Sequence, residues 1–384
     1  MRFEFATATR IVFGPGAVAE LGAVASPLGR RALLVTGRSP ERAEAASGAL
    51  TAAGVAVVPF PAVGEPTLDT VRTGVDAARR EGADLVVACG GGSAIDAGKA
   101  VAALLANGGD PLDYLEVVGR GRPIERPSLP FVAVPTTAGT GSEVTRNAVL
   151  ASPEHGVKAS LRSPLMLARA AIVDPDLLVG LPPPVVAAGG LDALAQLVEP
   201  FVSVRANPLV DALCREGLAR SARSLRRAFA GDAASSVRVD LALASLFGGL
   251  ALANAGLGAV HGIAAPVGGL FDAPHGAACA ALLPAVLRVN LRALAERRPG
   301  SPALARYREV AAILSGRSEA EAADGVAWVE ALVRELSVPG LSRWGATEAD
   351  VDRVVARARS ASSMKGNPIE LDDGELADIV RASL

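Results

Sequence analysis

The pattern of apolar residues changes near residue 180, and this change constrains the fold more than any other feature of the sequence. Before it, short apolar runs rich in β-branched residues alternate with segments of helical spacing, whereas after it strand patterns all but vanish. Strands are predicted over residues 32–36, 55–60, 84–89 and 131–135. Strands that alternate with helices imply a mostly parallel sheet covered on both faces. The sequence therefore predicts an α/β domain over residues 1–180 and an all-helical domain over residues 181–384.

Two segments qualify this outline. Residues 2–5 and 10–13 predict a small N-terminal hairpin, whose exposed edge would favour a homodimer by strand pairing. Residues 241–271 carry no formal charge and are long enough to cross a bilayer. Their seven glycines and Pro266 instead favour a buried helix followed by a glycine-rich loop. We therefore expect a soluble protein without a membrane partner.

Charge and cysteine content exclude several classes of protein. The chain has 38 basic and 40 acidic side chains, so its formal net charge is −2, without the basic blocks that nucleic acid or an anionic membrane requires. Its three cysteines are widely spaced and form neither a disulfide framework nor a CxxC pair. Charged residues within the first thirty positions leave no readable signal peptide. These features favour a cytoplasmic protein.

The first glycine-rich turn follows the strand over 84–89. It reads Gly90-Gly91-Gly92-Ser93 and leads into a helix that carries Asp96 and Lys99. Glycines let the backbone approach a ligand closely, and a helix N-terminus presents unpaired N–H groups at a positive dipole end. The turn therefore predicts a phosphate site, the alternative being a βα turn without a ligand.

A second such turn follows the strand over 131–135. It reads TTAGTGSE over residues 136–143, with hydroxyls at Thr136, Thr137, Thr140 and Ser142. Two phosphate-compatible turns at the carboxyl ends of strands in one sheet indicate a dinucleotide crevice. Neither turn has the GxGxxG pattern, so an ordinary Rossmann dehydrogenase is disfavoured.

A third loop, after the strand over 32–36, bears on the type of dinucleotide. An acidic residue there would bind a ribose 2′-hydroxyl and repel a 2′-phosphate. The sequence has Gly37, Arg38 and Ser39 instead, which leave space for a phosphate and offer it partners. This favours NADP over NAD, although a solvated arginine in a loop accounts for Arg38 equally well.

Metal-ligating residue types occur in the second half of the chain. Asp192 and Gln196 lie four residues apart and so share one helix face. His261 and His275, two of only three histidines, each precede a glycine, and the glycines and Pro274 between them require a bend that brings the imidazoles together. Such a set could hold Fe²⁺ or Zn²⁺. The alternative is that both histidines are hydrogen-bonded core residues.

These motifs together resemble the iron-containing, group III alcohol dehydrogenases, whose fold is shared with dehydroquinate synthase. The resemblance rests on the GGGS turn with Asp96 and Lys99, the TTAGTGSE turn, the GGLDAL helix at 189–194 and the two His-Gly pairs. It implies a nicotinamide cofactor in an interdomain cleft, with Gly91, Gly92 and Ser93 on its pyrophosphate. It also implies that Thr136, Thr137 and Ser142 line the cofactor and that Lys158 reaches its ribose. The metal positions fall on Asp192, Gln196, His261 and His275.

The chain departs from the family pattern at two positions. Gln196 stands where the family usually has histidine, and an amide oxygen is a weaker, neutral ligand. Ala265 stands where a histidine linked to proton handling often follows. The N-terminal stretch over 10–14 is similar to that of the maleylacetate reductases, a related branch that can work without a metal.

The favoured function is therefore an oxidoreductase that transfers a hydride between NAD(P)(H) and a small alcohol or aldehyde. A bound metal would polarise the substrate oxygen, and without one His261 and His275 could donate hydrogen bonds to it. One alternative is a metal-independent reductase like the maleylacetate reductases. Two others are a lyase of the dehydroquinate synthase type and a non-catalytic nucleotide-binding relic.

Overall fold

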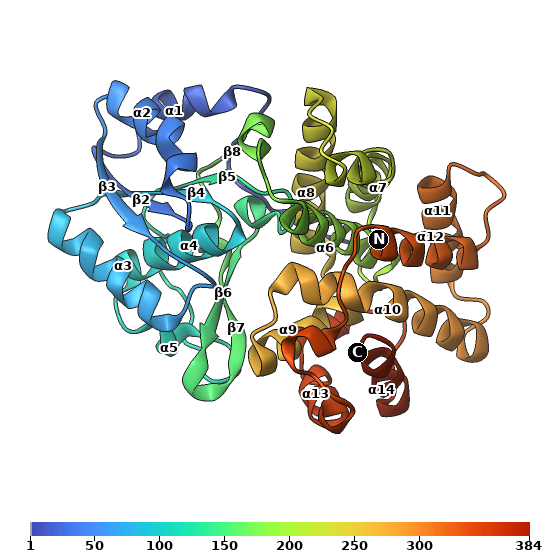
Figure 1. Ribbon diagram of the computed structural model, residues 1–384. Helices are drawn as coiled ribbons and strands as arrows, with labels where there is room; N and C mark the ends of the chain where they lie inside the picture. The colour runs from blue at the N-terminus through green and yellow to red at the C-terminus, as the bar shows by residue number, and fades with distance from the viewer. Residues whose placement is uncertain (1) are drawn as a thin grey trace. The chain divides into compact units, whose positions relative to one another are not determined.

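A computed structural model describes residues 2–384 and divides the chain into two compact units. One unit comprises Phe5–Gly180, and the other comprises Leu181–Leu384 together with residues 2–4. The first unit contains the strands, coloured blue to green in Figure 1, and the second is built from helices.

The first unit is organised around a six-stranded parallel sheet with strand order β1-β8-β5-β4-β2-β3. The three central strands, β2, β4 and β5, are buried almost throughout because helices cover both faces. All four predicted strands are present to within one residue at either end. The strands are β1 (Ile11–Phe13), β2 (Arg31–Thr36), β3 (Ala56–Pro61), β4 (Leu85–Gly90), β5 (Phe131–Pro135) and β8 (Ala170–Val173).

The helices of this unit pack closely on the sheet through small residues. The core on one face contains Ala46 and Leu50 of α2, packed with Leu34 of β2. On the other face, a Cβ added to Gly98 of α4 would lie 2.9 Å from the Ala88 Cβ of β4, so only glycine fits this contact. The helices are α1 (Leu21–Ala25), α2 (Glu44–Ala52), α3 (Leu68–Glu81), α4 (Gly92–Asn107) and α5 (Pro111–Tyr114).

The predicted N-terminal hairpin is wrong. Residues 2–10 contain no strand, and Ile11–Phe13 forms β1, which pairs in parallel with β8 and completes the edge of the large sheet. The apolar side chains of these three residues are partly buried there. The exposed hairpin edge on which homodimerisation was predicted is therefore absent from the described residues, and homodimerisation stays a prediction.

A hairpin that the sequence reading missed lies later in the same unit. Strands β6 (Asn147–Ser152) and β7 (Val157–Arg162) pair antiparallel. Their connection ends at Gly156, whose φ of 59° is the left-handed conformation that glycine adopts easily. β6 alternates between buried and exposed side chains over its second to fourth residues, as expected for a strand with one face covered.

The second unit consists of helices around the buried helix α6, in which every residue from Gly190 to Val202 is buried. Helices α6, α8 and α10 are long and apolar enough to cross a membrane by length and composition, but 78%, 61% and 72% of their apolar windows are buried inside the protein. The helices are α6 (Pro183–Val202), α7 (Pro208–Phe229), α8 (Ser235–Ala255), α9 (Ala259–Phe271), α10 (His275–Arg297), α11 (Pro302–Ser315), α12 (Ala322–Glu335), α13 (Val351–Ala358) and α14 (Asp373–Ala382).

The glycine-rich loop predicted within residues 241–271 is limited to residues 256–258 after α8, because the segment that follows is helix α9, which continues through Pro266. A proline deletes one backbone donor and bends a helix, but it does not end the helix when the flanking turns are buried. Close packing explains one of the glycines, because a Cβ on Gly262 would lie 2.3 Å from the Met364 sulfur. The predicted bend between the two histidines is present at Asp272, whose φ of 54° ends α9 before α10 begins.

Candidate metal centre and nucleotide turns

The three loops predicted to bind a dinucleotide start at neighbouring points of the sheet. The parallel register places Thr36 of β2 opposite Cys89 of β4. It places Gly90, at the end of β4, opposite Pro135 at the end of β5. The carboxyl ends of these strands therefore lie side by side, as a dinucleotide-binding sheet requires.

Glycine is needed where these loops meet. A Cβ on Gly91 would lie 3.3 Å from the Thr137 hydroxyl, and one on Gly92 would lie 2.7 Å from the Thr140 side chain. Helix α4 begins at Gly92, and its N-cap residue Gly91 supplies no side-chain cap. No side chain caps the first N–H groups of α4. Uncapped N–H groups at a helix N-terminus are typical of phosphate-binding sites.

The loop after β2 is more open. A Cβ on Gly37 would meet nothing within 4 Å. Arg38 is exposed and Ser39 is partly buried.

Asp96 and Ser142 meet, but inside a buried polar network. The Ser142 hydroxyl donates to the Asp96 carboxylate, which also accepts from the Val149 amide at 2.9 Å. The Lys99 ammonium donates to the backbone oxygens of Ser142 and Asn147 at 2.8 and 2.7 Å. It also donates to the hydroxyls of Ser142 and Thr145, at 3.2 and 3.0 Å. Burial lowers the pKa of Lys99 to about 8. The network fixes the loop after β5 onto helix α4.

The remaining predicted cofactor residues lie in the same unit. Lys158 is on β7, and its ammonium pairs with the Glu65 carboxylate. Thr136 is buried, whereas Thr137 and Ser93 are partly accessible.

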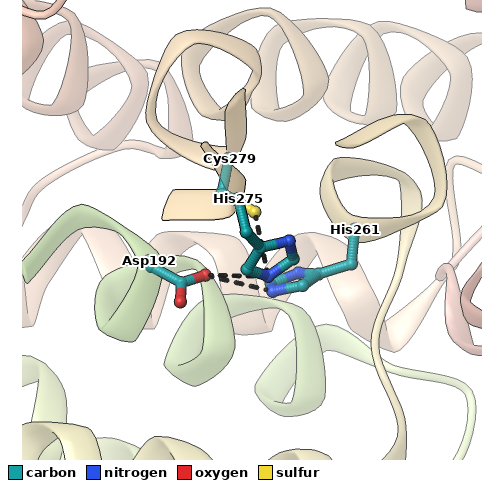
Figure 2. A group of neighbouring side chains, drawn as sticks. All are labelled: Asp192, His261, His275 and Cys279. Carbon is teal, nitrogen blue, oxygen red and sulfur yellow. Dashed lines mark hydrogen bonds and ion pairs between the residues drawn. The ribbon is translucent and has the colours of Figure 1, made fainter. Parts of the chain in front are cut away.

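Four side chains from three helices form a compact donor set in the second unit (Figure 2). Asp192 comes from α6, His261 from α9, and His275 and Cys279 from the first two turns of α10. One donor atom from each residue lies within 4.8 Å of the others. Asp192 Oδ1 is 3.2 Å from His261 Nε2 and 3.7 Å from His275 Nε2, and Cys279 Sγ is 3.7 Å from His275 Nε2. The imidazole centroids are 5.4 Å apart.

Two further side chains orient this set. Glu199 Oε2 lies 2.5 Å from His261 Nδ1, while its other oxygen accepts from the Val260 amide at 2.7 Å. The carboxylate therefore holds the His261 ring with Nε2 directed at Asp192, as acids behind metal-bound histidines do. Gln196 Nε2 donates to Asp192 Oδ2 at 3.0 Å.

The residues present fit a cation. Three buried polar atoms here form no hydrogen bond within residues 2–384, although the first two face each other as an ion pair: Asp192 Oδ1, His261 Nε2 and Gln196 Oε1. A native core rarely leaves such atoms unpaired, since each costs about 1–3 kcal/mol. A carboxylate oxygen and an imidazole nitrogen are ordinary ligands of Zn²⁺ and Fe²⁺.

The charges of the set are strongly coupled. Cys279, and then Asp192, raise the pKa of His275 to about 9 against the effect of burial. Burial by itself would lower the pKa of His261, but Cys279, Glu199 and Asp192 together raise it well above its ordinary value. Burial would raise the pKa of Asp192, but His275 and His261 hold it below its ordinary value.

The structure thus brings together Asp192, His261 and His275, three of the four predicted metal positions, with Gln196 beside them. Sequence reasoning missed Cys279 and Glu199. Both carry the spacing of a shared helix face: Cys279 is four residues after His275, and Glu199 is seven after Asp192.

Comparison with known families identifies the family of this chain. The model of the iron-containing alcohol dehydrogenase family matches residues 8–175, and that of the C-terminal region of the Fe-containing alcohol dehydrogenase family matches residues 186–384. The chain therefore belongs to the iron-containing alcohol dehydrogenase family.

Individual relatives span nearly the whole chain. The 1,3-propanediol dehydrogenase of Citrobacter freundii is 36% identical over 99% of this chain and 98% of its own length. The NAD-dependent methanol dehydrogenase of Bacillus methanolicus is 33% identical over 97% of each chain. A crystal structure of 1,3-propanediol oxidoreductase superposes with a TM-score of 0.91 at 34% identity, covering 100% of both chains. The sulfoacetaldehyde reductase of Bifidobacterium kashiwanohense, solved with NAD⁺, has a TM-score of 0.87 at 27% identity, covering 100% of this chain and 99% of its own.

Proposed function

We propose that this enzyme transfers a hydride between a nicotinamide cofactor and a small alcohol or aldehyde, with help from a divalent metal. The observation that carries the proposal is the compact donor set itself, in which Asp192 Oδ1 lies 3.2 Å from His261 Nε2 and 3.7 Å from His275 Nε2. Relatives named as propanediol and methanol dehydrogenases support an alcohol as the substrate.

Asp192, His261 and His275 would hold the metal, which supplies a Lewis acid that polarises the substrate oxygen when it is bound. The protein residues set up this chemistry. Glu199 fixes the His261 ring through Nδ1 and so keeps Nε2 directed into the set. His275, whose side chain is 38% exposed, is the accessible member of the set.

The cofactor would bind at the strand ends of the first unit. We propose that Gly91, Gly92 and Ser93 contact its pyrophosphate at the N-terminus of α4, since this turn combines close-approach glycines with uncapped N–H groups. Thr136 and Thr137 follow β5, next to that turn in the sheet.

We further propose a preference for NADP over NAD. Gly37 leaves open space where an acidic residue would repel a 2′-phosphate, and the exposed Arg38 follows it. The test compares Gly37→Asp with the parent enzyme using NADPH and NADH. We expect kcat/KM for NADPH to fall at least about tenfold relative to NADH, because like charges repel. Equal use of both cofactors by the parent enzyme would contradict this preference.

Turnover is tested with metal-loaded protein and a panel of short-chain alcohols and aldehydes, by following NAD(P)H absorbance. Net reduction or oxidation of the cofactor supports the dehydrogenase. Product formed without net consumption of cofactor would instead support the lyase, and cofactor binding without any turnover would support the non-catalytic alternative.

A further inference from the structure

We propose that Cys279 is the fourth metal ligand of this enzyme and that Gln196 instead positions Asp192. The inference deepens the metal-assisted reaction proposed above. It assigns the thiolate of Cys279 to a donor set with Asp192, His261 and His275, and it predicts a site that favours a thiophilic ion such as Zn²⁺.

The first support is distance. Ligand atoms about 2.0–2.3 Å from a tetrahedral zinc ion lie about 3.3–3.8 Å from one another. The three donor pairs given above are separated by 3.2, 3.7 and 3.7 Å. The pair that includes Cys279 Sγ is therefore already at ligand spacing, and Figure 2 shows its sulfur beside the two imidazoles.

The second support is the unpaired polar atoms next to the thiol. Asp192 and His261 are only 1% and 5% exposed, and their facing atoms Oδ1 and Nε2 form an ion-pair contact at 3.2 Å but no hydrogen bond within residues 2–384. Cys279 is fully buried. A shared cation would satisfy all of these buried donor atoms at once, which an apolar environment would not do.

The third support is the orientation of Gln196. Its amide nitrogen donates to Asp192 Oδ2, while its oxygen lies 3.3 Å from the position of a Cβ on Gly248 of α8. If the Gln196 amide were turned over, its oxygen would face Asp192 Oδ2 at 3.0 Å, with no proton between the two oxygens to form a hydrogen bond. Gln196 therefore acts as a donor that turns Asp192 Oδ1 toward the histidines.

The chemistry of the donors points the same way. A thiolate is an anionic, soft ligand that selects zinc and related ions, whereas a carboxamide oxygen is neutral and hard. Cys279 sits one helical turn after His275, so both reach the same ion from one face of α10. The pair at Asp192 and Gln196 uses the same spacing for a hydrogen bond instead.

The test uses full-length, metal-free protein titrated with Co²⁺ under anaerobic conditions, without substrate or nicotinamide. We expect about one Co²⁺ per chain and a sulfur-to-cobalt charge-transfer absorption in the near ultraviolet. Cys279→Ser should lose this absorption and bind Co²⁺ at least about tenfold more weakly. Cys214→Ala removes an equally buried thiol on α7 and is the matched control, expected to keep both properties.

Gln196→Ala separates the two assignments. We expect this variant to keep the charge-transfer absorption, since the sulfur ligand remains, while its affinity falls through loss of the hydrogen bond to Asp192. If Cys279→Ser does not fold, as judged by circular dichroism, the absorption of the parent protein and of Gln196→Ala still decides the matter.

Several results would overturn the proposal. They are Co²⁺ binding by the parent protein without a sulfur absorption, an absorption that survives Cys279→Ser or disappears in Cys214→Ala, and failure of the parent protein to bind Co²⁺. If the parent protein shows the absorption but turns over no alcohol, the assignment of Cys279 is supported and the proposed function is contradicted. If it turns over alcohol but shows no sulfur absorption, the proposed function is supported and the assignment of Cys279 is contradicted.

Discussion

Two buried polar clusters, one in each unit, differ in a way that separates structural from chemical roles. Lys99 in the first unit is fully buried, and its ammonium donates to four oxygens. Asp192 and His261 in the second unit are almost as deeply buried, yet Asp192 Oδ1 and His261 Nε2 form only an ion-pair contact at 3.2 Å and no hydrogen bond in the described chain. A satisfied network rigidifies a fold, whereas an unsatisfied one marks a place for a ligand.

The largest effect that this comparison predicts follows the loss of His261. His261→Ala should lower kcat by about 10³-fold or more, because it removes a metal position worth several kcal/mol of charge stabilisation. The measurement is steady-state turnover of the metal-supplemented variant. Nicotinamide binding, followed by fluorescence, should stay near the parent value, and turnover close to that of the parent would exclude this site.

The corresponding change in the satisfied cluster should affect stability rather than chemistry. Lys99→Met leaves the backbone oxygens of Ser142 and Asn147 without their donor, so we expect a loss of about 3 kcal/mol in the free energy of unfolding. Urea denaturation followed by circular dichroism measures it. Lys365→Met, at an exposed position, should stay within about 0.5 kcal/mol of the parent. Co²⁺ affinity should not change in either variant.

The acid behind His261 should matter less than the histidine itself. Glu199→Gln keeps an acceptor for the Val260 amide but weakens the hold on the imidazole, so metal affinity should fall about 10- to 100-fold. Competition with a chelator of known affinity measures the change. Glu216→Gln on the surface of α7 serves as the control, and an equal loss there would show that the effect is not local.

The smallest predicted effect is a pH dependence at the edge of the satisfied cluster. Burial raises the pKa of Glu143 to about 7, although its backbone amide and Lys99 act in the opposite direction. Between about pH 4.5 and 7 the folded protein then holds a proton that the unfolded chain has released. The free energy of unfolding should therefore fall as the pH rises across this window. The measurement is urea denaturation at a series of pH values. Glu143→Gln should flatten the plot of unfolding free energy against pH, whereas Glu154→Gln, at an exposed position, should leave its slope unchanged.

The main outline of both units could be predicted from sequence because it depends on local periodicity. The β5 strand (Phe131–Pro135) was predicted to the residue, and the all-helical character of residues 181–384 was predicted as well. Helix α9 was not predicted, because Pro266 and the glycines within this segment lower its helix propensity. Only tertiary packing makes the segment helical. The partner of β1 lies about 160 residues away, and no local pattern identifies it.

The site divides in the same way. Asp192, His261 and His275 could be found from residue type and spacing. Cys279 was missed, because its four-residue spacing from His275 is informative only when α10 begins at His275 and so places both side chains on one face. The acceptors of Lys99 are backbone oxygens 43 and 48 residues away, which residue type does not encode.

The unequal exposure of the donor set has a consequence for exchange kinetics. Asp192, His261 and Cys279 are closed off from solvent, while the His275 side chain is 38% exposed. An ion would therefore enter and leave over His275, and the rotation of that one imidazole would set its residence time. Small chelators should then strip the metal faster than bulky ones of equal affinity, so loss of activity during purification would depend on the size of the chelator and on the time of contact.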